Sequence, residues 1–159
     1  MPSSIMMSLS SDVIRLLQGR TLASAESCTG GGIGAALTAV SGSSAVFKGG
    51  IISYCNEVKH HVLGVDQNVL DTIGAVSGPV AEAMAAGARK VLAADIAVSA
   101  TGLAGPGGDE LGNPVGTVFI GYSDEFTTFA REFHFSGNRE DVRNQAIEAA
   151  LAIILEHNK

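Results

Sequence analysis

The feature that most constrains the fold is an apolar run that ends in a polar stretch and a cluster of glycines. Residues 21–25 predict a short buried strand, and residues 32–40, rich in alanine and glycine, predict a helix. Between them lies the segment Glu26-Ser27-Cys28-Thr29-Gly30-Gly31. A strand, a glycine turn and a helix N-terminus present N–H groups and a dipole that favour a phosphate or a developing oxyanion. We therefore expect an anion site here, although such turns also serve packing alone.

Strand-like and helix-like segments alternate along most of the chain, and two strand-like segments come close together near its end. The first expected helix is capped by Ser10 or Ser11 and ends at Gly19. The other expected helices are 32–40, 56–63, 79–92 and 139–157, and the expected strands are 21–25, 45–54, 96–100, 116–122 and 127–135. Alternation predicts parallel strands and the late pair predicts a hairpin, so the fold class is α/β, a three-layer α/β/α single domain with a mixed sheet.

Composition is consistent with a globular protein of this class. The 159 residues fit one domain, with residues 1–8 expected to be flexible, and 46% of them are hydrophobic while 16% are charged. A net charge of -6 argues against binding to nucleic acid or to an acidic membrane surface. No stretch is apolar and long enough to span a bilayer, and Cys28 and Cys55 show no disulfide or metal spacing, so we expect a cytoplasmic protein with reduced thiols. The four histidines also lack metal-ligand spacing, and no metal or cofactor is expected.

A serine nucleophile in this chain would need a base other than histidine. No His-Asp pair accompanies Ser27 or Ser44 at a recognisable spacing. Lys59 is the available base, provided that burial or a neighbouring cation lowers its pKa from about 10.4. The alternative is that Lys59 is a solvated helix residue, free or paired with Glu57.

Four other polar residues allow two interpretations each. Cys28 is either a thiolate nucleophile at a helix N-terminus or a small packing residue. Glu26 either accepts a hydrogen bond from a ligand ribose or accepts one from a nearby backbone N–H. Arg139 and Arg143 lie four residues apart on the last predicted helix, where both can face a phosphate or pair with Glu140.

Six strings of residues, spread over nearly the whole chain, occur in the order seen in the CinA C-terminal family. They are Ala25-Glu26-Ser27-Cys28-Thr29-Gly30-Gly31, Gly42-Ser43-Ser44, Tyr54-Cys55-Asn56-Glu57-Val58-Lys59, Gly74-Ala75-Val76-Ser77, Gly102-Leu103-Ala104-Gly105-Pro106 and Pro114-Val115-Gly116-Thr117. Through these motifs the chain resembles a stand-alone member of that family.

The resemblance implies hydrolysis of the carboxamide of nicotinamide mononucleotide, giving nicotinate mononucleotide and ammonia, at a metal-free Ser/Lys/Tyr site. Ser44 is then the expected nucleophile and Lys59 the base that takes its proton, while Tyr54 and Ser27 relay this proton or orient the reacting groups. The alternative exchanges the roles of the two serines. The matching positions expected to contact the mononucleotide are Glu26, Cys28, Thr29, Gly30, Gly31, Thr101, Gly102, Gly105, Pro106, Gly107, Arg139 and Arg143. Backbone N–H groups of residues 29–31 or of Gly102 would stabilise the oxyanion.

The chain also departs from the family pattern. Asn138 stands where members commonly carry an aspartate, and the second glycine loop continues as Gly107-Gly108-Asp109 where members often have an Asp or an extra glycine. These changes affect substrate placement rather than fold. Two other functions stay open: a nucleotide-binding module without turnover, and an interaction protein of the competence or DNA-damage response. The alanine-rich segment 79–92 suits packing on the sheet or on a second copy, and a homo-oligomer is expected.

Overall fold

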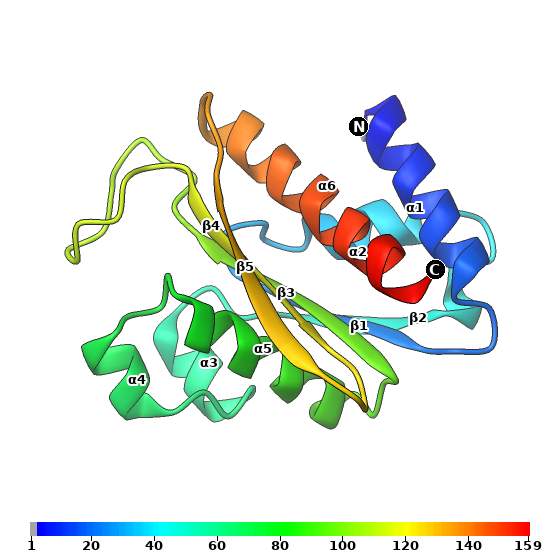
Figure 1. Ribbon diagram of the computed structural model, residues 1–159, viewed down its shortest axis with the longest axis horizontal. Helices are drawn as coiled ribbons and strands as arrows, with labels where there is room; N and C mark the ends of the chain where they lie inside the picture. Colours follow the sequence, from blue (N-terminus) through cyan, green and yellow to red (C-terminus); the bar gives the residue numbers. More distant parts are fainter. Residues whose placement is uncertain (1–2) are drawn as a thin grey trace.

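The computed structural model describes residues 3–159 as one domain built around a five-stranded mixed sheet (Figure 1). The strand order is β2-β1-β3-β4-β5. The first three of these strands run parallel, and the last two are added antiparallel as a hairpin. Their bounds are β1 Leu22–Glu26, β2 Phe47–Ile52, β3 Ile96–Gly102, β4 Thr117–Ser123 and β5 Thr128–His134. The predicted three-layer fold with a mixed sheet is confirmed.

Helices cover both faces of the sheet. The helices α1 (Ser4–Leu16), α2 (Gly32–Thr38) and α6 (Arg139–Asn158) lie on one face, and α3 (Asn56–His61), α4 (Gln67–Thr72) and α5 (Gly78–Val91) lie on the other (Figure 1). Side chains alternate between the two faces, as the pleat of a strand requires. Leu22 and Val98 join the core beneath α6, whereas Ala23 and Ala97 join the core beneath α5.

Small residues bring α5 close to the sheet. A Cβ atom on Gly121 in β4 would collide with the backbone carbonyl of Ala81 in α5. Ser99 in β3 donates a hydrogen bond to the same carbonyl at 2.6 Å. The alanine-rich segment 79–92 is therefore used, at least on this side, for close packing on the sheet.

Two local expectations were wrong. Helix α1 begins at Ser4 rather than after Ser10 or Ser11, because the Ser3 side chain caps it by accepting the N–H of Met6. Residues 4–8 are therefore helical rather than flexible, and Met6 is buried. Residues 1 and 2 lie outside the described part of the chain. Helix α4 was not expected, although Asp66 caps it by accepting the N–H of Asn68 at 2.7 Å.

The chain connections open a crevice at the carboxyl ends of β1 and β2. The connection that leaves β1 runs through α2 on one face, whereas the connection that leaves β2 runs through α3 on the other. Ligands of open α/β sheets bind where neighbouring connections diverge in this way. Ser27 follows β1 and Tyr54 follows β2, so both lie at this edge.

None of the helices within residues 3–159 is long and apolar enough to cross a membrane.

Candidate active site

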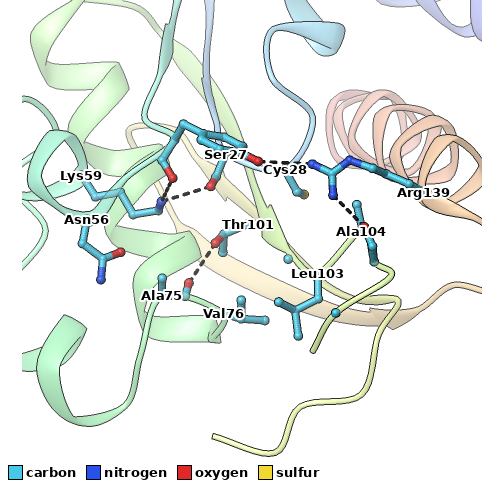
Figure 2. Close-up of a pocket in the computed structure, with 14 residues that line it drawn as sticks. Ser27, Cys28, Asn56, Lys59, Ala75, Val76, Thr101, Leu103, Ala104 and Arg139 are labelled. Atoms are coloured by element: carbon cyan, nitrogen blue, oxygen red, sulfur yellow. Dashed lines mark hydrogen bonds between the residues drawn. The ribbon is translucent and has the colours of Figure 1, made fainter. Parts of the chain in front are cut away.

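A pocket of about 330 Å³ lies at the carboxyl edge of the sheet (Figure 2). Its walls come from the segment after β1, the segment that joins β2 to α3, the segment before α5, the glycine loop after β3 and the start of α6. The lining residues are Ser27, Cys28, Tyr54, Asn56, Lys59, Ala75, Val76, Thr101, Gly102, Leu103, Ala104, Gly105, Gly107 and Arg139.

Ser27 and Lys59 meet inside this pocket. Lys59 on α3 reaches back to the end of β1, where its Nζ lies 3.1 Å from Ser27 Oγ, and only 2% of the lysine is exposed. The same Nζ lies 2.7 Å from the Ser53 carbonyl and 3.5 Å from that of Tyr54. A neutral amine has two N–H donors and one lone pair, which match two carbonyls and one hydroxyl.

Burial lowers the pKa of Lys59 from its ordinary value of 10.5. The largest cause is desolvation, because a charged ammonium loses its hydration inside the protein. No carboxylate within residues 3–159 pairs with this lysine to restore the charged form. Lys59 therefore has the two properties of a base for Ser27: contact with the hydroxyl and a lowered pKa.

The structure does not bring Ser44 to this site. Ser44 lies in the short 3₁₀ helix η1 (Ser43–Ala45), before the amino end of β2, and it is exposed. Lys59 follows the carboxyl end of the same strand, so the six residues of β2 separate the two side chains within one chain. The expectation that Ser44 attacks with Lys59 as its base is wrong for this arrangement. The exchanged assignment, with Ser27 beside Lys59, matches the geometry.

The N-terminus of α2 is occupied by a carboxylate of the protein itself. Glu26 is 1% exposed and accepts hydrogen bonds from the N–H groups of Ile33 at 2.8 Å and Gly34 at 3.0 Å. The hydroxyl of Thr29 donates to the same carboxylate at 2.6 Å. Of the two interpretations of Glu26, the structure favours the backbone partner. The first glycine turn is therefore not an open anion site at the helix end, and Glu26, Thr29, Gly30 and Gly31 do not line the pocket.

Arg139 lies at the rim of the pocket. Its guanidinium donates to the Gly105 carbonyl at 2.7 Å and to the Tyr54 hydroxyl at 3.2 Å (Figure 2). Tyr54 thus presents its hydroxyl to Arg139 and its backbone carbonyl to Lys59, so of its two expected roles, relaying and orienting, these contacts match the second. Both acceptors of Arg139 are neutral, so its positive charge stays available to an anion.

Arg143 lies one helical turn further and has a different role. It donates to the carbonyls of Cys28 and Thr29, both at 3.1 Å, and does not line the pocket. Neither Arg139 nor Arg143 pairs with Glu140 or with any other carboxylate within residues 3–159. Arg143 holds the turn that carries Ser27 and adds positive charge behind it.

The second glycine loop forms the opposite wall. Gly102, Gly105 and Gly107 line the pocket as expected, whereas Pro106 does not. Thr101 is 1% exposed and donates its hydroxyl proton to the Ala75 carbonyl at 2.9 Å. It therefore positions the segment before α5 that closes this side of the pocket.

Cys28 is poorly suited to attack a carbonyl carbon. Burial raises the pKa of its thiol to about 11, so the thiolate is scarce at neutral pH. Its backbone N–H makes no hydrogen bond to another residue within 3–159. An amide directly after the nucleophilic residue is a common oxyanion donor, and Cys28, which lines the pocket, follows Ser27 directly.

Sequence reasoning missed three pocket residues, Asn56, Ala75 and Val76, whereas Leu103 and Ala104 lie in the glycine loop 102–107 that was expected to line the ligand. A signal existed for Asn56, because it precedes Lys59 by three residues on a predicted helix and so shares its face. Across residues 3–159 no three His, Cys, Asp or Glu side chains converge in a way that could hold a metal ion.

The protein is an α/β protein with a mixed sheet and a buried serine–lysine pair at the carboxyl edge of that sheet. The sequence profile of the CinA C-terminal domain matches residues 6–157, and the chain belongs to this family. A CinA-like protein of Mycolicibacterium gilvum is 49% identical over 143 residues, which cover 89% of this chain and 34% of that protein. One of Thermosynechococcus vestitus is 54% identical over 130 residues, with coverages of 80% and 31%. The chain thus spans about a third of the length of these curated relatives.

Solved structures of similar length share the whole fold. The competence/damage inducible protein CihA of Agrobacterium tumefaciens is 35% identical, with a TM-score of 0.96 and coverages of 100% of this chain and 99% of that one. A competence-damaged protein (CinA) superfamily protein of Escherichia coli is 34% identical, with a TM-score of 0.93 and coverages of 96% and 90%.

Proposed function

We propose that this protein is an amidohydrolase that converts nicotinamide mononucleotide to nicotinate mononucleotide and ammonia. The observation that carries the proposal is the contact of 3.1 Å between Ser27 Oγ and the buried Lys59 Nζ. A serine is a weak nucleophile unless a base takes its proton, and a lysine whose pKa is lowered by burial is such a base.

In the first half of the reaction, Ser27 Oγ attacks the carboxamide carbon and its proton moves to Lys59 Nζ. The new C–O bond leaves negative charge on the amide oxygen, which the N–H of Cys28 would stabilise. Lys59 then returns the proton to the amide nitrogen. The C–N bond breaks, ammonia leaves, and an acyl ester stays on Ser27.

In the second half, water replaces the serine. Lys59 takes a proton from a water molecule, whose oxygen attacks the ester carbon. The ester bond to Ser27 breaks, and its oxygen takes the proton back from Lys59. The products are the original hydroxyl and a carboxylic acid, which becomes the carboxylate by giving its proton to solvent or to the released ammonia, so one water is consumed and one ammonia is released.

The proposed substrate has a phosphate, and the pocket rim has a cation for it. Arg139 lies at the rim with only neutral partners, and Arg143 adds charge behind the turn that carries Ser27. Arginine binds phosphate well because its planar guanidinium can donate two parallel hydrogen bonds. With Ser27 at the amide and Arg139 at the phosphate, the mononucleotide would extend across the pocket.

The test is ammonia release from nicotinamide mononucleotide by the purified protein, compared among four forms. We expect release by the wild type, loss by at least about a thousandfold in Ser27→Ala and Lys59→Ala, and activity within about twofold of wild type in Ser44→Ala. Loss in Ser44→Ala with retention in Ser27→Ala would reverse the assignment of the nucleophile. Folded wild-type protein that binds the mononucleotide without releasing ammonia would instead be a binding module.

A further inference from the structure

The turn after β1 connects Arg143 to the backbone N–H of Cys28 through two peptide groups. The Arg143 guanidinium donates to the Thr29 carbonyl at 3.1 Å. The N–H of the same peptide group belongs to Gly30, and it donates to the Ser27 carbonyl at 3.1 Å. The N–H of that second peptide group belongs to Cys28, and within residues 3–159 no acceptor pairs with it. The chain of hydrogen bonds thus begins at a cation and ends at a free donor next to Ser27.

Arg143 also sets the direction in which the peptide groups of this turn point. Its Nε donates to the Cys28 carbonyl at 3.1 Å, so the guanidinium holds the peptide groups on both sides of Thr29. These peptide bonds are trans, and the C=O and N–H of a trans peptide group point in opposite directions. A carbonyl that is held by a donor therefore directs the N–H of its own peptide group. Gly30 permits this approach, because a Cβ atom there would lie only 3.3 Å from the Arg143 guanidinium.

The charge of Arg143 strengthens the donor at the other end of this chain. Hydrogen bonds in a chain polarise one another, because a carbonyl that accepts a hydrogen bond makes the N–H of its own peptide group a stronger donor. The effect is larger when the first donor is ionised. Arg143 pairs with no carboxylate in the described chain, so no ion pair cancels its charge. It does not line the pocket, and it acts on a bound ligand only through the turn.

We propose that Arg143 is a positioning residue that orients and polarises the oxyanion donor, the N–H of Cys28. The inference rests on the proposed function, in which attack by Ser27 leaves negative charge on the amide oxygen. A direct contact of Arg143 with the mononucleotide, as the sequence led us to expect, predicts that its removal raises KM. The hydrogen-bond chain instead predicts a fall in kcat with KM nearly unaltered, because the bond to the oxyanion is strong only in the transition state.

The experiment compares nicotinamide mononucleotide with its thioamide, in which sulfur replaces the amide oxygen. Sulfur is a weak hydrogen-bond acceptor, so the N–H of Cys28 stabilises a developing sulfur anion much less than an oxyanion. The readout is kcat/KM for the amide divided by kcat/KM for the thioamide, both measured by ammonia release. A partial loss of folded protein, or weaker binding of the phosphate, lowers both values by the same factor and leaves this ratio unaltered.

We expect Arg143→Met to lower kcat for the amide about thirtyfold with KM within about twofold of wild type, and to lower the ratio about tenfold. Arg143→Lys keeps the charge but loses the fork that holds two carbonyls, so its ratio should lie between those of Arg143→Met and the wild type. The matched control is Arg131→Met. Arg131 lies on β5, pairs with Glu156 and does not line the pocket, so its removal should change neither kcat nor the ratio.

The outcomes separate this inference from the function on which it rests. If the wild type releases ammonia but Arg143→Met gives the same ratio as Arg131→Met, the role of Arg143 is refuted and the deamidase stands. A rise in KM with unaltered kcat in Arg143→Met also refutes it, and would return Arg143 to phosphate binding. If folded wild-type protein releases ammonia from neither compound, both the function and the inference are overturned.

Discussion

Burial decides the chemistry of individual residues in this site. Lys59 and Glu26 are both nearly inaccessible, at 2% and 1% exposure, yet their environments differ. Lys59 faces two carbonyls and a hydroxyl, which suit a neutral amine, and desolvation lowers its pKa. Glu26 receives two backbone N–H groups and two hydroxyls, which suit a carboxylate. Glu26 therefore holds the start of α2, and in the proposed reaction Lys59 moves a proton.

The pKa of Lys59 predicts how activity depends on pH. Only the neutral amine can take the proton of Ser27, so kcat falls tenfold per pH unit on the acid side of the lowered pKa. The apparent pKa of this limb should lie below 10.5, the ordinary value. Ammonia release measured from pH 5 to 10 gives the profile. Lys59→Arg, which keeps a charge that cannot be removed, should be inactive throughout; activity in that variant would contradict the proton transfer.

The same shift predicts a pH dependence of stability with a defined sign. Between the lowered pKa and 10.5 the unfolded chain holds more protons on this lysine than the folded chain does, so the free energy of unfolding rises with pH there. Below the folded pKa the difference is constant. Urea unfolding of the wild type and Lys59→Met across this window measures it. The free energy of unfolding of the wild type should rise relative to that of Lys59→Met as pH rises. Exposed Lys90→Met should show no such trend relative to the wild type.

The residues that form and support the pocket lie at the ends of helices and strands rather than in their middles. Helix α2 begins at Gly32 after Gly31, whose φ of 98° is left-handed and suits glycine. Glu26, the last residue of β1, caps the same helix, so the strand and helix are joined around the turn that carries Ser27. At α6, Asn138 and Asp141 form a capping box. Asn138 therefore serves as a helix cap, and Arg139 follows it directly to the pocket rim.

Removal of the α2 cap should destabilise the protein and disturb the site. In Glu26→Gln one oxygen becomes an NH₂ donor that faces other donors, and the cost should be about 3 kcal/mol, since hydrogen bonds to a charged group contribute about 1.5–3 kcal/mol each. Ammonia release should fall as well, because the turn that holds Ser27 loosens. Urea unfolding measures the stability. Exposed Glu57→Gln serves as the control, and a change in Glu26→Gln as small as in that control would show that the cap is dispensable.

At the scale of the whole molecule, the charge near the pocket is opposite in sign to the net charge of the chain. The chain has a net charge of -6, yet Arg139 at the pocket rim and Arg143 behind the turn that carries Ser27 pair with no carboxylate in the described chain. A site of this kind attracts an anion locally while the remaining surface repels it. This agrees with a small phosphate-bearing ligand better than with nucleic acid, which needs an extended basic surface.

Ionic strength should therefore act mainly on substrate binding. We expect the KM for nicotinamide mononucleotide to rise several-fold between about 0.05 and 0.5 M salt with little change in kcat, because the distance over which exposed charges are screened falls from about 14 Å to about 4 Å over this range. Arg139→Gln should raise KM about tenfold and flatten the salt dependence. Arg15→Gln, at an exposed arginine paired with Asp12, is the control. An unaltered salt dependence in Arg139→Gln would assign the phosphate to another group.

The sequence by itself determined the element types and the fold class. Period-two and helical patterns, glycine breaks and caps depend on local sterics and hydrogen bonding, and every expected strand and helix occurs. It also singled out Ser27 and Thr101, because polar residues that follow buried strands mark the edge where sites form. Lys59 was singled out as the available base, and Arg139 by its place on the last helix and by the family resemblance.

Only the tertiary structure decided which of these residues meet. The parallel pairing of β1 with β2 brings Lys59 beside Ser27 and leaves Ser44 at the far end of β2. It likewise turns Glu26 to the helix end and Asn56 to the pocket wall. Strand order and connection direction depend on contacts between residues far apart in the chain, and local patterns carry no record of them.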